Sequence, residues 1–123
     1  MEQEIDVFYN RYGKPILRLL NDGRLVGFNG HNYYFIDNDA VYNYQGQQVG
    51  WIGGGLIRDL SGNVFVFGER VTDNVKPFLP FKQFKPFASF VQFPPYKPYL
   101  PYKKLKPLPS FSWSNYKLTQ DDE

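Results

Sequence analysis

The stretch Phe8-Tyr9-Asn10-Arg11-Tyr12-Gly13-Lys14-Pro15-Ile16 contains the signal that decides the fold. At its centre, Asn10 stands three residues before Gly13, which is typical of a hairpin loop made of a type I turn and a left-handed glycine. Asparagine favours the first turn position because its side chain bonds the turn backbone, and glycine tolerates positive φ. The stretch therefore predicts a β-hairpin with a bulged loop.

The same pattern recurs three times along the first part of the chain. Further glycines follow Gly13 at intervals of 17, 16 and 16 residues. Asn43 and Asp59 stand three residues before the last two, whereas Gly27 holds this place in the second repeat. The equivalent turn glycines are Gly30, Gly46 and Gly62. The regular spacing predicts four copies of one hairpin.

The loop type also predicts a register, in which the residue five before each glycine pairs with the residue three after it. The predicted pairs are Phe8–Ile16, Leu25–Tyr33, Val41–Val49 and Ile57–Phe65. All eight residues are apolar, which indicates one buried column repeated four times. Second turns are expected at Asn21-Asp22-Gly23, Asp37-Asn38-Asp39 and Gly53-Gly54-Gly55. We therefore expect eight short strands between about residues 5 and 70, and no helix.

Four hairpins of this size cannot each bury their own apolar face. Closing them around an axis buries the four columns together and removes free strand edges. We therefore expect an all-β fold, a small pseudo-fourfold shallow barrel of four β-hairpins. A twisted two-sheet meander is the alternative.

The repeated turn sequences resemble the 4-fold beta flower domain, a small bacterial family. The resemblance rests on the series Tyr9-Asn10-x-x-Gly13, Tyr42-Asn43-x-x-Gly46 and Arg58-Asp59-x-x-Gly62, with Gly50-Trp51-Ile52 between them. It covers about residues 5–70 and implies a square barrel of four hairpin petals, with no catalytic residues to carry over. The ending Ser110-Phe111-Ser112-Trp113-Ser114 is also similar to endings in that family. Gly27 departs from the pattern, so the second loop is expected to differ.

The remainder of the chain is organised in threes. From Phe78 to Phe111 every third residue is aromatic or leucine, and Val75 precedes them in phase. Seven prolines share a second phase, and most lysines of the segment share the third. Polyproline II has three residues per turn, so each phase forms one edge. The sequence therefore predicts an extended polyproline-II-like C-terminal tail with an aromatic edge, a proline edge and a lysine-bearing edge.

The predicted tail is much longer than the domain that precedes it. Residues 75–111 would span roughly 110 Å at about 3.1 Å per residue, whereas the domain should measure about 25–30 Å across. The tail must therefore bend back, project into solvent or run along something large. A disordered linker is the plain alternative, but disordered linkers are poor in aromatic residues. We divide the chain into a four-hairpin domain at 1–74, the period-three tail at 75–111 and an end segment at 112–123.

The end segment begins where the period changes from three to two. Phe111 and Trp113 alternate with serines, which suits a short strand added to a sheet edge. A loose terminus is the alternative.

Charge is divided between the two parts of the chain. Residues 1–74 have six Lys/Arg and nine Asp/Glu, a net of −3, and residues 75–123 have eight lysines and three acids, a net of +5. Such asymmetry is typical of a folded domain with a binding arm. The chain has no cysteine, an acidic start and no apolar run long enough for a membrane span, so we expect a cytoplasmic protein.

Catalytic chemistry has no support in the sequence. The single histidine, His31, follows a turn glycine and is expected to be exposed, and no nucleophile motif accompanies it. Gly53-Gly54-Gly55 precedes a strand and not a helix, which argues against a phosphate-binding loop. We expect no catalytic residue, metal ligand, cofactor or small-molecule substrate, and no enzyme.

Function is therefore expected in the tail, as a structural or adaptor protein that binds a protein partner, a larger assembly or itself. The candidate partner-binding residues are Phe78, Phe81, Phe84, Phe87, Phe90, Phe93, Tyr96, Tyr99, Tyr102, Phe111 and Trp113. The candidate basic contacts are Lys82, Lys85, Lys97, Lys103, Lys104 and Lys106. Nucleic-acid or ribonucleoprotein binding is the alternative, because lysines and aromatic rings can pair with phosphates and stack on bases. Lipid or membrane-surface contact is a lesser alternative.

Overall fold

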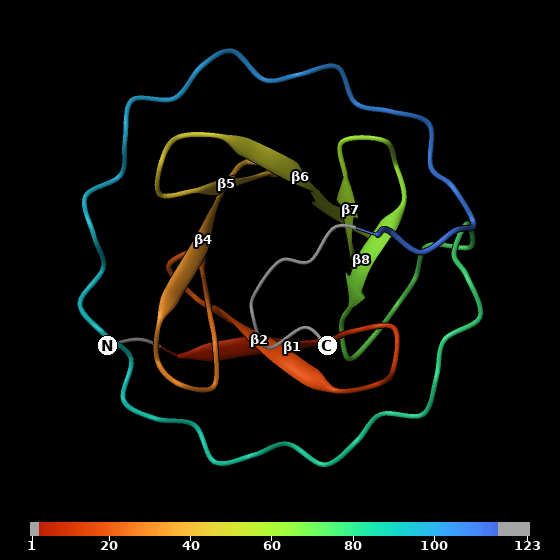
Figure 1. Cartoon of the computed structure of the whole chain (residues 1–123), viewed down its shortest axis with the longest axis horizontal. Helices are drawn as coiled ribbons and strands as arrows, with labels where there is room; N and C mark the ends of the chain where they lie inside the picture. The colour runs from red at the N-terminus through yellow and green to blue at the C-terminus, as the bar shows by residue number, and fades with distance from the viewer. Residues whose placement is uncertain (1–2, 116–123) are drawn as a thin grey trace.

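The computed structural model describes residues 3–115, which form eight antiparallel strands closed into one barrel and a long tail that encircles it (Figure 1). Neighbouring strands in the barrel are also neighbours in the sequence, and β8 closes on β1 through Tyr9 and Phe67. The strands are β1 (Glu4–Tyr9), β2 (Pro15–Leu20), β3 (Arg24–Val26), β4 (Asn32–Asp37), β5 (Ala40–Asn43), β6 (Gln48–Gly53), β7 (Leu56–Asp59) and β8 (Val64–Phe67). The expected all-β barrel of four hairpins is confirmed.

Each hairpin forms one petal of the barrel, and all four petals have the same tip. Petals 1 to 4 are β1–β2, β3–β4, β5–β6 and β7–β8. Their tip glycines, Gly13, Gly30, Gly46 and Gly62, have φ between 83° and 92°. In petal 1 the Gly13 N–H donates to the Asn10 carbonyl and the Asn10 N–H donates to the Lys14 carbonyl, and the other petals repeat both bonds. The predicted loop type is confirmed.

The second petal reaches the same backbone without the expected side chain. Its Gly27 accepts from the Gly30 N–H as Asn10, Asn43 and Asp59 do in their petals. The Asn29 side chain accepts from the His31 N–H and donates to the Tyr33 hydroxyl. A different residue therefore supplies the side-chain support, and the expectation of a different loop is wrong for the backbone.

The predicted cross-strand pairs are wrong by one residue in all four petals, for one reason. Phe8 lies opposite Leu17 and Tyr9 lies opposite Pro15, so Ile16 is the extra residue of a β-bulge. Tyr33, Val49 and Phe65 are passed over in the same way. A bulge places two residues opposite one. The predicted register assumed regular pairing beyond the loop and so did not allow for this extra residue.

The predicted column is nevertheless the core of the barrel. One hydrophobic cluster on the axis takes both partners of each predicted pair, with Tyr33 at its half-buried margin. Leu17, Tyr34 and Val66, which follow the bulged residues, join it. The bulge therefore turns two consecutive side chains of these petals into the core, which strict alternation would not do.

The tail forms a closed loop around the barrel, hereafter the ring (residues 76–111), visible as the outer trace in Figure 1. It contains no helix and no strand, as expected of an extended segment. A loop of about 110 Å has a diameter of about 35 Å, slightly more than the expected width of the domain. The ring therefore has the length needed to pass once around its own barrel. This path explains how a tail much longer than the width of the domain can still lie against it.

Candidate functional site

The ring is held at the four petal tips at regular intervals of nine residues. The backbone carbonyls that lie against the tip glycines belong to Phe81, Phe90, Tyr99 and Leu108, in the order of petals 1 to 4. At three petals a backbone N–H of the ring donates to the glycine carbonyl: Gln83 to Gly13 at 2.8 Å, Gln92 to Gly30 at 2.9 Å and Ser110 to Gly62 at 3.1 Å. At these three tips glycine is required because a Cβ would fall on the ring backbone.

Petal 3 is the exception, and its sequence explains why. The residue nine positions after Gln92 is Pro101, which has no N–H to donate to Gly46. The ring also lies farther out at this tip, where a Cβ built on Gly46 would be 3.3 Å from the Tyr99 carbonyl oxygen, against much closer approaches at the other three tips. Here the Lys104 N–H donates instead to Gln48 Oε1 at 2.8 Å.

The nine-residue step is also present in the sequence of the ring. Residues 76–84 read KPFLPFKQF, 85–93 read KPFASFVQF, 94–102 read PPYKPYLPY and 103–111 read KKLKPLPSF. Each repeat belongs to one petal and contributes three side chains to the apolar edge. The period of three is the stronger pattern, so the sequence reasoning missed this longer repeat, although it was there to be found.

Arg58 fastens the two ends of the ring together, a role that sequence reasoning also missed. Its side chain is 10% exposed, and its Nη1 donates to the Gly62 and Ser110 carbonyls at 2.8 and 2.9 Å. Its Nη2 donates to Asp73 Oδ2 at 3.1 Å and to the Val75 carbonyl. Asp73 and Val75 come just before the ring and Ser110 is near its end, so one guanidinium holds the start and the finish of the ring. We call this group the clasp.

The clasp pairs a positive arginine with a negative carboxylate at neutral pH. A hydrogen bond from the Val75 N–H and the nearby Arg58 guanidinium hold the pKa of Asp73 below its ordinary value. The carboxylate is therefore ionised when the arginine is charged. The planar fork of arginine suits a site with several acceptors in different directions.

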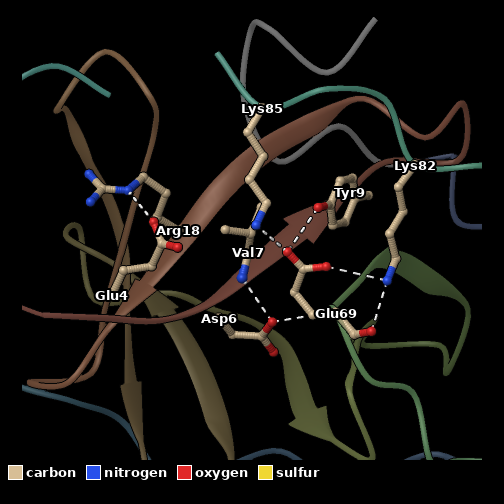
Figure 2. A network of polar contacts seen from close by, with 8 residues as sticks. All are labelled: Glu4, Asp6, Val7, Tyr9, Arg18, Glu69, Lys82 and Lys85. Carbon is tan, nitrogen blue, oxygen red and sulfur yellow. Dashed lines mark hydrogen bonds and ion pairs between the residues drawn. The ribbon is translucent and has the colours of Figure 1, made fainter. Parts of the chain in front are cut away.

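Lysines of the ring reach inward to acids of the barrel, as Figure 2 shows around Glu69. Lys82 and Lys85 both contact the Glu69 carboxylate, which also accepts from the Tyr9 hydroxyl at 3.0 Å. Burial alone would raise the pKa of Glu69, but the hydrogen bonds from Lys85, Tyr9 and Lys82 outweigh it and lower the pKa. Burial and the Glu69 contact raise the pKa of Tyr9.

Three more of the predicted lysines also face the barrel. Lys106 contacts Asp39 at 2.8 Å and lowers the pKa of that carboxyl, and Lys103 lies 3.9 Å from Asp37. Lys97 lies over the Phe35 ring at 5.4 Å. The predicted lysines of this edge thus face the barrel and help to hold the ring. Leu79 and Leu100 of the same edge pack against side clusters of the barrel.

The aromatic edge faces outward along the whole ring, and we call it the rim. Its exposed fractions run from 87% to 101% over eleven positions and fall to 66% at Phe111. The members are Phe78, Phe81, Phe84, Phe87, Phe90, Phe93, Tyr96, Tyr99, Tyr102, Leu105, Leu108 and Phe111. Among residues 3–115 the rim side chains are left exposed, so partner binding by the rim stays a prediction.

Trp113 does not belong to the rim. It forms a parallel bridge with Val64 of β8, where the Val64 N–H donates to Ser112 and the Ser114 N–H donates back to Val64. Its indole packs against Phe67, with ring centroids 6.2 Å apart. The strand-like reading of this segment is thus the one the structure adopts, and Trp113 anchors the tail.

The barrel, its four equivalent tips and its encircling tail define a class of protein. The chain belongs to the 4-fold beta flower protein family, whose model matches residues 6–120 and so takes in the ring as well as the barrel. No curated protein and no solved structure matches the chain. The described residues contain no helix that is long and apolar enough to cross a membrane.

Proposed function

We propose that this protein is a non-enzymatic binding module that presents its rim to a protein partner or a larger assembly. The observation that supports this most is the outward position of all twelve rim side chains, held there by a ring that is itself bonded to the barrel. A surface kept apolar and held in place is typical of a recognition site.

The size of the rim agrees with this role. An aromatic side chain buries about 150–250 Å², so the nine from Phe78 to Tyr102 present roughly 1,300–2,200 Å². Typical monomers expose single apolar patches of about 300–600 Å², and a standard interface buries about 800 Å² per partner. Each aromatic side chain buried by a partner would contribute on the order of 1.5–3 kcal/mol to binding, before the entropy cost of ordering the interface is subtracted. Because the backbone of residues 76–111 is already held against the barrel, part of this entropy cost does not arise on binding.

The structure favours a protein partner over nucleic acid. Phosphate binding needs cations that face outward, whereas Lys82, Lys85, Lys103 and Lys106 contact carboxylates of the barrel. A lipid partner is also less suited, because the rim is a single row of side chains around a closed loop. Since the rim side chains point outward around a closed loop, a flat membrane surface would touch only one arc of the rim.

The test replaces three adjacent rim residues, Phe84, Phe87 and Phe90, with glutamine in the full chain. The three side chains are fully exposed, so the unfolding free energy should change by less than about 0.5 kcal/mol. Partner binding should fall sharply, measured by quantitative affinity capture together with sedimentation velocity for self-association.

A matched control changes exposed apolar residues outside the rim, Ile5, Tyr12 and Leu60, also to glutamine. This control should retain binding. If the rim variant and the control capture the same proteins and sediment alike, the rim is not the binding surface. Capture of nucleic acid that survives in the rim variant would instead support the alternative.

A further inference from the structure

The ring is bound to the petal tips through its backbone and not through its rim. The three repeated bonds join backbone N–H groups of the ring to backbone carbonyls of Gly13, Gly30 and Gly62. The Ser89 N–H adds a bond to the Phe28 carbonyl at 2.8 Å. Such backbone contacts select an extended segment whose N–H groups have the right spacing. They place little restriction on which side chains the segment carries.

Side chains of the barrel extend this recognition to further backbone groups. Asn32 Nδ2 donates to the Gln92 and Phe93 carbonyls at 3.3 and 2.9 Å, and Arg24 Nη1 donates to the Gln92 carbonyl at 3.1 Å. Both side chains are nearly buried. The outer wall of the barrel is thus a built track for an extended chain, and it is independent of whatever binds the rim.

The occupant of this track is held by many shallow contacts. No residue of the ring, 76–111, is buried. At petal 3 the bond to Gly46 is missing, and a cavity of about 550 Å³ opens beside Gly46, Gln48 and Pro101. The clasp and Trp113 secure the two ends, so the middle of the ring depends on weak, repeated bonds.

We propose that the track accepts the tail of a second copy of this chain in place of its own tail. The repeats KPFLPFKQF and KPFASFVQF each place a glutamine N–H donor at their eighth position, Gln83 and Gln92, so the tail of a second copy offers the petal tips the same bonds as the resident tail. The residues 1–74 carry a net −3 and the residues 75–123 a net +5, so the barrel of one copy attracts the tail of another as it attracts its own. Exchange of an identical element between copies is a low-cost route to association.

The test uses a fluorescein-labelled peptide of residues 76–93 and fluorescence anisotropy with the full chain. The resident tail competes at a high effective concentration, so Arg58→Ala, which opens the clasp, should bind the peptide at least about tenfold more tightly than the unmodified chain. Asp73→Ala opens one side of the clasp only and serves as a second, milder variant if Arg58→Ala does not fold.

A control peptide carries Gln83→Pro and Gln92→Pro, which remove the two N–H donors to the tip glycines and keep length, charge and the aromatic residues. It should bind at least about tenfold more weakly than the native peptide. Equal binding of the two peptides would show adhesion of the aromatic side chains and overturn the proposal. No binding of the native peptide to either folded variant would overturn it as well.

Discussion

Replacing Arg58 with alanine is expected to lower the free energy of unfolding by about 2–4 kcal/mol and to break the link between the start and the finish of the ring. The buried guanidinium donates to the Gly62 and Ser110 carbonyls, to Asp73 and to the Val75 carbonyl. Without it these acceptors lose a charged donor, and the link that Arg58 makes between residue 75 and residue 110 is lost. Urea denaturation gives the loss of stability, and the rate of trypsin cleavage after Lys82 and Lys103 reports release of the ring.

Two further variants separate the clasp from a general effect of losing an arginine. Arg58→Lys keeps the charge near Asp73 but has no planar fork, so it should recover only part of the stability. Arg18→Ala removes the Glu4 pair, which is on the barrel away from the ring ends, and should cost less than about 1 kcal/mol. The clasp has no such role if cleavage in Arg58→Ala is as slow as in Arg18→Ala.

Alanine at the tip of petal 2 is expected to cost more than alanine at the tip of petal 3. Gly30 and Gly46 have φ of 84° and 90°, so the backbone strain of alanine, about 1–2 kcal/mol, is shared by both. At Gly30 the new Cβ would overlap the Phe90 carbonyl, whereas at Gly46 it would stand 3.3 Å from the Tyr99 oxygen, a contact that a small shift relieves. Gly30→Ala should therefore lose about 1–2 kcal/mol more stability and the Gln92 bond.

Urea denaturation of the two variants measures this difference, because each is the control for the other. Hydrogen exchange at the Gln92 amide adds a local reading, since this N–H should exchange faster in Gly30→Ala and remain protected in Gly46→Ala. Equal losses of stability would mean that the ring does not press on the tips as the structure shows.

The barrel was predictable because its information is local. A turn such as Asn10 to Gly13 specifies its own backbone, and four regular copies require closure. The bulges escaped because the loop rule counts residues and does not see where two consecutive side chains turn inward. Pairs such as Ile16-Leu17 and Phe65-Val66 carried that signal, since two adjacent apolar residues break the alternation of a strand.

The site was predictable in part, since the period of three found the rim but not its support. The rim could be predicted from the sequence because polyproline II has three residues per turn, so every third side chain lies on the same edge whatever the tail packs against. The clasp does not, because Arg58 acts on Val75 and Ser110, which meet only once the ring has closed. The path of the ring could have been found from the nine-residue repeat set beside the four tip glycines.

The central claim is that the tail encircles its own barrel with one nine-residue repeat at each petal. Engineered thiols test it directly, because the chain has no cysteine of its own. Gln83 Nε2 donates to the Tyr12 carbonyl at 3.0 Å, so Tyr12→Cys with Gln83→Cys should be joined within one chain by a short bismaleimide crosslinker. Asn29→Cys with Gln83→Cys, one petal out of register, should not. Equal crosslinking of the two pairs, or none in either, would contradict the ring.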